Sequence, residues 1–85
     1  MNTIHRYTIR IADEQSVEMP EGAQIIHAGE APNGDLSVWA KVDTTKPLEW
    51  RRLAMRGTGH PLPEDAEWVA TFRNGHFMWH VFTLQ

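Results

Sequence analysis

Apolar and polar residues alternate along much of this chain with the period of two that β-strands produce. The first such run is Thr3–Ile11, where Tyr7, Ile9 and Ile11 share one face and polar residues occupy the other. The same alternation predicts further strands at Val17–Met19, Gln24–Ala28, Leu36–Val42 and Leu48–Arg56, followed by the two arms of a closing hairpin. Helix signals are weak, and only Pro63–Glu67 has the proline and acidic residues of a helical turn.

Two Asn-Gly pairs, Asn33-Gly34 and Asn74-Gly75, predict β-hairpins with two-residue type I′ turns. The first turn would pair Ala28 with Trp39 and His27 with Ala40. The second turn would place three pairs on one face: Phe72 with Phe77, Ala70 with Trp79, and Trp68 with Val81. We therefore expect an aromatic core in which Trp79 is among the most buried side chains.

The predicted fold is a single β-rich domain over residues 1–85, mostly β, with at most one short helical turn. Its strands would form a small antiparallel sheet of sandwich or barrel-like form. The 41% hydrophobic and 22% charged residues are ordinary for a globular domain, so disorder is not expected.

The chain contains no cysteine, which favours a reducing cytoplasm and excludes thiol catalysis and cysteine-based zinc sites. Its first residues show no apolar signal-peptide core. No apolar run approaches the roughly 18 residues of a membrane span, so no membrane partner is expected.

The formal net charge of −3 argues against nucleic acid as a partner. Charge is nevertheless unevenly distributed. Residues 11–35 hold six acidic residues and no lysine or arginine, whereas residues 41–60 hold five basic and two acidic residues. The pattern is compatible with an ordinary solvated surface, or with a basic face that binds an anion or an acidic partner.

The most unusual segment is the loop Gly57-Thr58-Gly59-His60-Pro61, which follows Arg52 and Arg56. Two glycines in three residues permit backbone conformations closed to other residues and expose amides that can face an anion. The segment matches neither a P-loop nor a dinucleotide-binding fingerprint. It is either a wide turn between strands or a ligand-binding loop, and we predict Gly57, Thr58, Gly59, His60, Arg52 and Arg56 as ligand-binding residues.

Catalytic and metal-binding patterns are absent from the sequence. His76 and His80 share a strand face, but four residues of strand separate them by about 13 Å, too far for one metal ion. Thr58 is at most a weak nucleophile, with His60 as the nearest candidate base. We therefore predict no catalytic residues, no metal and no cofactor.

The chain resembles a family of short proteins of unknown function found in tailed bacteriophages and, as prophage genes, in bacterial genomes. Five blocks carry the resemblance: Thr3–Tyr7, Met19–Ala23, Trp39–Asp43, Gly57–Pro61 and Phe77–Phe82. They span nearly the whole chain, and the glycine-histidine loop and the closing tryptophan-histidine block are specific in combination.

Three positions depart from the family pattern: Arg6 replaces a lysine, Ala70 a glycine and Thr83 an acidic residue. None of them lies in the glycine-histidine loop. The resemblance implies a phage or prophage origin and action in a bacterial host cytoplasm, and it implies no activity.

Three functional interpretations remain open. The leading one is a non-enzymatic phage accessory protein that binds a small anionic, nucleotide-like ligand and sequesters a host defence signal. The second is an inhibitor of a host protein that acts through the acidic segment 11–35. The third is a minor hydrolase that uses His60. We also predict a homo-oligomer with Gly57–Pro61 at or near the interface, because a second copy supplies the wall that one small core cannot.

Overall fold

The computed structural model describes residues 1–85 and consists of strands and loops without a helix. The seven strands are β1 (Asn2–Thr8), β2 (Glu14–Pro20), β3 (Gln24–Glu30), β4 (Leu36–Asp43), β5 (Leu48–Gly57), β6 (Glu67–Asn74) and β7 (Phe77–Thr83). They form a three-stranded sheet in the order β1-β4-β3 and a four-stranded sheet in the order β2-β5-β7-β6. All pairings are antiparallel, and the sheets do not close into a barrel. The predicted fold class is confirmed.

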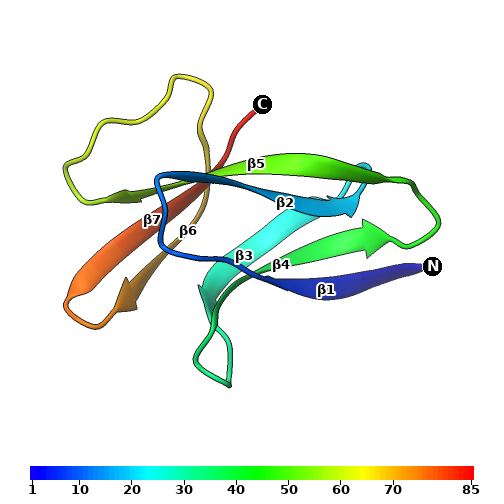
Figure 1. Ribbon diagram of the computed structural model, residues 1–85, viewed down its shortest axis with the longest axis horizontal. Helices are drawn as coiled ribbons and strands as arrows, with labels where there is room; N and C mark the ends of the chain where they lie inside the picture. The colour runs from blue at the N-terminus through cyan, green and yellow to red at the C-terminus, as the bar shows by residue number, and fades with distance from the viewer.

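The two sheets pack against each other across a shared apolar layer (Figure 1). In the view of Figure 1, β2 and β5 run above β1, β3 and β4, while the β6–β7 hairpin crosses diagonally on the left. Asn74 links the sheets directly, because its Nδ2 donates a hydrogen bond to Glu30 Oε1 at 2.7 Å. No helix in the structure is long and apolar enough to cross a membrane.

The main core lies between the sheets and takes its side chains from the strand faces that alternation predicted. It consists of Ile9, Ala28, Val38, Leu53, Met55, Ala70 and Val81. A second cluster, around Met19 and Val42, continues this layer toward the other end of the sandwich. Tyr7 packs against both clusters, and its burial raises the pKa of its hydroxyl.

A third apolar cluster lies on the opposite face of the four-stranded sheet. Ala54, Phe82 and Leu84 are each at most 8% exposed there, and Ala66 packs against them from the loop between β5 and β6. The loop therefore covers part of the outer face of this sheet. The Pro63–Glu67 segment forms a single turn, closed by the Ala66 N–H bond to the Pro63 carbonyl, instead of a helix.

The first strand is shorter than predicted. It ends at Thr8, and although Ile9 is buried, Ile11 is 53% exposed. Residues 9–13 carry the chain from one sheet to the other. Gln15 stabilises this crossing, because its side chain accepts a hydrogen bond from the Arg10 N–H and donates one to the Arg10 carbonyl.

The predicted two-residue turn at Asn33-Gly34 is wrong. Hydrogen bonds from Ala31 N–H to the Asp35 carbonyl and from Gly34 N–H to the Ala31 carbonyl enclose a three-residue loop. Pro32 suits the first central position of a type I turn, and Gly34 has a φ of 89°. Such a turn followed by a left-handed residue is the usual three-residue hairpin loop. It shifts the register by one residue, so Ala28 pairs with Val38, not Trp39, and His27 pairs with Trp39, not Ala40.

The second hairpin does have a two-residue turn, but at Gly75-His76 and not at Asn74-Gly75, since Asn74 pairs with Phe77. Gly75 has a φ of 62°, and no non-glycine residue has a positive φ, so the turn is not type I′. The observed pairs are Phe72 with Trp79, Ala70 with Val81 and Trp68 with Phe82.

The expected aromatic core is also wrong, because a register irregularity between Trp68 and Ala70 changes the face of Trp68. Such a bulge moves one side chain to the other side of the sheet. Trp68 is consequently 66% exposed. Trp79 remains on the inner face and packs against the main core, but it is only partly buried.

Candidate functional site

The loop after β5 begins with a tight turn, Gly57–His60, whose backbone conformation requires the glycine at position 59. The His60 N–H bonds to the Gly57 carbonyl at 3.2 Å, which closes a four-residue turn. Gly59 is the second central residue and has a φ of 91°. Type II turns require a positive φ at this position, which favours glycine there. The turn leaves the Thr58 and His60 side chains on the loop surface.

Gly57 has a different role, because the His60 ring lies over it. A Cβ atom at position 57 would be 3.4 Å from His60 Cε1 and 3.8 Å from Trp79 Cζ3. The missing side chain therefore lets the imidazole pack close to the end of β5. This contact places the His60 ring beside the last residue of β5.

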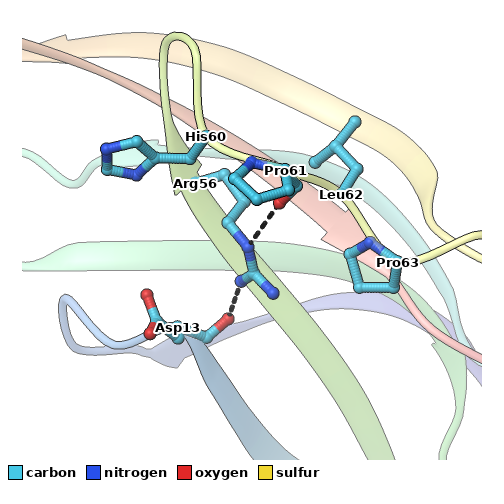
Figure 2. Close-up of a pocket in the computed structure, with 6 residues that line it drawn as sticks. All are labelled: Asp13, Arg56, His60, Pro61, Leu62 and Pro63. Carbon is cyan, nitrogen blue, oxygen red and sulfur yellow. Dashed lines mark hydrogen bonds between the residues drawn. The ribbon is translucent and has the colours of Figure 1, made fainter.

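Three adjoining hollows meet at His60, the residue that lines all of them. The first, of about 450 Å³, is lined by Asp13, Arg56, His60, Pro61, Leu62 and Pro63 (Figure 2). The second, of about 220 Å³, is lined by Arg56, Gly57, Thr58, Gly59, His60, Leu62, His80 and Phe82. The third, of about 310 Å³, is lined by Ile11, Ala12, Asp13, Met55, Gly57, His60 and Trp79. The first two also share Arg56 and Leu62, whereas the third is lined by Met55 and Trp79 from the inner face of the sheet. We call the three hollows together the His60 groove.

Arg56 is the cation of the His60 groove. Its Nε donates to the Pro61 carbonyl at 3.1 Å, and its Nη1 donates to the Asp13 carbonyl (Figure 2). Nη1 also donates to the Met55 carbonyl at 3.1 Å. No carboxylate oxygen lies within 4.0 Å of the guanidinium, and Nη2 makes no hydrogen bond. Backbone carbonyls therefore hold the guanidinium in place without neutralising its charge.

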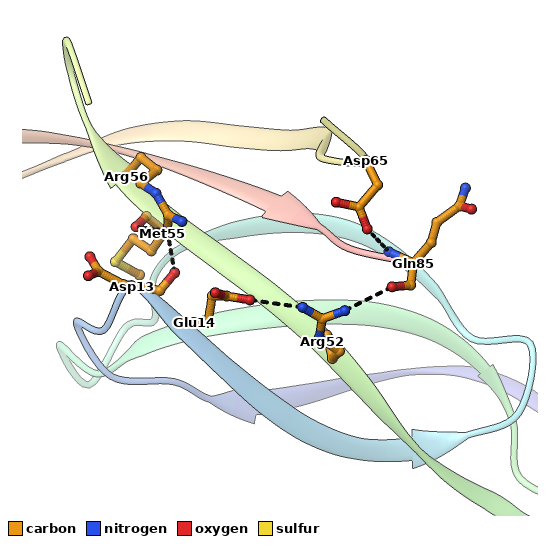
Figure 3. Close-up of polar contacts among 7 residues, drawn as sticks. All are labelled: Asp13, Glu14, Arg52, Met55, Arg56, Asp65 and Gln85. Atoms are coloured by element: carbon orange, nitrogen blue, oxygen red, sulfur yellow. Dashed lines mark hydrogen bonds and ion pairs between the residues drawn. The ribbon is translucent and has the colours of Figure 1, made fainter. Parts of the chain in front are cut away.

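Arg52 lies on the same face of β5 but outside the groove. Its Nη2 forms an ion pair with Glu14 at 3.0 Å, and its Nη1 donates to the Gln85 carbonyl at 3.0 Å (Figure 3). It lines a separate hollow with Trp50 and Glu67. Of the six predicted ligand-binding residues, the structure thus brings together Arg56, Gly57, Thr58, Gly59 and His60, and leaves Arg52 apart.

Residues 1–85 match the family described as Domain of unknown function (DUF7352) over the whole chain. The chain belongs to this family. No curated protein and no solved structure matches it.

In this DUF7352 domain, the structure adds a residue that the sequence analysis did not assign to the site. His80 pairs across the strands with Arg56 and lines the second hollow. Its Nε2 is 2.9 Å from Thr58 Oγ1, and its Nδ1 is 2.9 Å from Thr71 Oγ1. The Trp68 indole N–H in turn donates to Thr71 Oγ1 at 3.0 Å. His80 could have been assigned to the site from the sequence only by pairing it with Arg56 on one face of the sheet. That pairing requires the correct register of β5 and β7.

The structure forms neither a catalytic pair with His60 nor a metal-binding cluster. Asp65 is committed elsewhere, because its Oδ2 accepts the Gln85 N–H at 3.1 Å (Figure 3). No carboxylate forms a hydrogen bond with His60. No three His, Cys, Asp or Glu side chains lie close enough to hold a metal ion.

The acidic segment 11–35 does not form one continuous strand surface. Glu14 and Glu18 lie in β2 of the four-stranded sheet, Glu30 lies in β3 of the three-stranded sheet, and the other three acids lie in the loops and turns around them. Glu14 pairs with Arg52, and Glu30 accepts a hydrogen bond from Asn74. Asp35 accepts a hydrogen bond from the Asn33 side chain at 3.2 Å, so three of the six acids are engaged in contacts within the chain.

Proposed function

We propose that this DUF7352 domain is a non-enzymatic protein that binds a small anionic, nucleotide-like ligand in the His60 groove. The observation that carries the proposal is the unneutralised guanidinium of Arg56, held in a hollow beside His60. The two N–H groups of Nη2 remain free to donate to a phosphate or carboxylate oxygen, and hydrogen bonds from a charged donor to an anion are stronger than neutral ones.

The groove also has the size and the order that a small ligand needs. Two of its three hollows, of about 310 and 450 Å³, fall within the roughly 300–1,000 Å³ of small-molecule sites. Arg56 is already fixed by the carbonyls of Asp13, Met55 and Pro61. Fixing a long side chain before binding lowers the entropy that the complex loses. Pro61, Leu62 and Phe82 add apolar surface for the uncharged part of the ligand.

Binding without chemistry is the interpretation that the polar contacts support. A hydroxyl nucleophile is usually activated by a base that a third group orients. Two carboxylates of the same loop, Glu64 and Asp65, could orient His60, but Asp65 bonds the Gln85 backbone and Glu64 makes no hydrogen bond with His60. Thr58 bonds with His80 and not with His60.

We further propose a phage or prophage origin and a role in the bacterial host cytoplasm, in which the domain sequesters a host defence signal. The support is the resemblance carried by the Gly57–Pro61 and Phe77–Phe82 blocks. Sequestration requires tight binding without turnover, which agrees with a preorganised groove that lacks an assembled catalytic group.

Arg56→Gln is expected to weaken the binding of inorganic phosphate and nucleotides, measured by isothermal titration calorimetry, about 10- to 100-fold. The reason is the loss of a charge-assisted contact, which is typically worth about 1.5–3 kcal/mol. Arg52→Gln is the matched control, because it removes the same charge from the same face of the same strand.

Unfolding in urea must show that both glutamine variants remain folded, since Arg56 also supports the loop. Arg56→Lys retains the charge and should lose less affinity than Arg56→Gln. No wild-type binding at millimolar phosphate or nucleotide would refute the proposal, as would equal losses from the Arg52 and Arg56 variants.

We also propose that the domain functions as a homo-oligomer. Ten large apolar side chains are at least 44% exposed, which is many for a chain of this size. Ile11 and Leu62 belong to this set and line the His60 groove, so an interface there would bring a second copy beside the ligand. Light scattering at micromolar concentration should give at least twice the mass of one chain. A monomer throughout this range would contradict the proposal.

A further inference from the structure

The exposed indole of Trp68 is held in one orientation beside the His60 groove. Trp68 is 66% exposed, yet its Nε1 donates to Thr71 Oγ1 at 3.0 Å. Trp50 is equally exposed, at 67%, but its Nε1 makes no hydrogen bond within the chain. Trp68 is thus an aromatic surface that faces solvent and is also fixed by a polar contact.

A chain of hydrogen bonds connects Trp68 to the glycine-histidine loop. An indole N–H can only donate, so the Thr71 hydroxyl oxygen accepts from Trp68. The same hydroxyl bonds His80 Nδ1, and His80 Nε2 bonds the Thr58 hydroxyl, each at 2.9 Å. The indole, the imidazole and the loop are therefore held as one unit. This series of hydrogen bonds ends at Thr58, which lines the second hollow.

From this geometry we propose that Trp68 is a stacking platform for the nucleobase of a nucleotide whose phosphate binds Arg56. The inference rests on the proposed function and names the ligand class of the same site. Bases stack on aromatic side chains through their π-faces, largely independently of sequence. A planar base can stack on the exposed face of the indole, whereas an aliphatic or purely polar ligand cannot.

The proposed contacts lie on three neighbouring strands, and the Arg56 guanidinium extends from them toward Asp13, on the β2 side of β5. Thr71, His80 and Arg56 are aligned across the neighbouring strands β6, β7 and β5. Adjacent strands lie about 4.8 Å apart, so the distance from the Thr71 backbone to the Arg56 backbone is roughly 10 Å. The phosphate would lie at Arg56, the sugar over His80 and the base on Trp68. Phe82, the cross-strand neighbour of Trp68, lines the hollow between them.

The decisive comparison uses adenosine 5′-monophosphate and ribose 5-phosphate, which differ by the base alone. Isothermal titration of the full chain should show the nucleotide binding about 5- to 100-fold more tightly than the sugar phosphate, the range expected for one stacked base. Trp68→Leu should reduce nucleotide affinity to the ribose 5-phosphate level and leave ribose 5-phosphate binding unchanged. Trp68→Phe should retain part of the preference, and Trp50→Leu should retain all of it.

Two outcomes would overturn the platform. One is equal wild-type affinity for the nucleotide and ribose 5-phosphate. The other is an equal effect of Trp68→Leu and Trp50→Leu on nucleotide binding. If both ligands bind equally and Arg56→Gln weakens both, the anion site stands while the nucleobase platform fails. If neither ligand binds, the proposed function fails together with this inference.

Discussion

Leu53→Ala is expected to lower the free energy of unfolding by about 2–5 kcal/mol, the range for a buried leucine truncated in a packed core. Leu53 is 2% exposed and lies on β5, which has a paired strand on each side. It packs with Val38 from the other sheet and Val81 from its own sheet, so its removal leaves a cavity between the layers. A domain of this size has a total stability of only about 5–10 kcal/mol, so this loss is a large share of the whole.

Urea unfolding monitored by circular dichroism measures this change. Leu48→Ala is the matched control on the same strand, because Leu48 is 62% exposed and its truncation should change stability by no more than about 0.5 kcal/mol. Similar losses from the two variants would show that β5 does not carry the core of the sandwich.

Strand positions were predictable because alternation is a local property of the sequence. In β4, Val38, Ala40 and Val42 recur at every second position, and all three are buried. The period of two specifies which residues share a face before any partner strand is known. The same parity puts the neighbouring residues Arg51 and Arg52 on opposite faces of β5. In the structure, Arg51 donates to the Ala23 carbonyl while Arg52 pairs with Glu14.

Strand register was not predictable from the two Asn-Gly pairs, because the same dipeptide is compatible with several turns. At the first hairpin, Pro32 and the hydrogen bond from Asp35 N–H to Asn33 Oδ1 favour a three-residue loop. At the second hairpin, the turn moves to Gly75-His76 and the register changes by two residues. An even change preserves strand faces, so Trp79 stayed on the inner face as predicted.

The candidate site was predictable only in part, for a related reason. The residues of the loop are neighbours in sequence, so Gly57, Thr58, Gly59 and His60 necessarily lie together. Whether an arginine joins them depends on tertiary contacts. Arg56 does, because its guanidinium bonds the Pro61 carbonyl, whereas Arg52 lies one four-residue step, or about 13 Å, further along the strand.

Trp79→Ala is expected to cost about 2–4 kcal/mol, less than the roughly 3–5 kcal/mol of a fully buried tryptophan, because Trp79 is only partly buried. Its ring packs against the main core and lies 5.9 Å from the Phe77 ring. Its Nε1 is buried without a hydrogen-bond partner, and an unsatisfied donor already reduces the net contribution of this side chain to stability. Trp79→Phe removes this donor and should therefore be milder than Trp79→Ala.

Trp68→Ala is the matched comparison, since Trp68 lies in the same hairpin and its side chain is mostly in solvent. Its truncation should cost less than about 1 kcal/mol, chiefly through the lost hydrogen bond to Thr71. Urea unfolding of the two alanine variants at one pH measures the difference directly. A greater loss from Trp68→Ala than from Trp79→Ala would mean that the bulge between Trp68 and Ala70 does not form and that Trp68 belongs to the inner face. A nucleobase platform requires Trp68 to be on the outer face, so this comparison also tests the geometry on which that proposal depends.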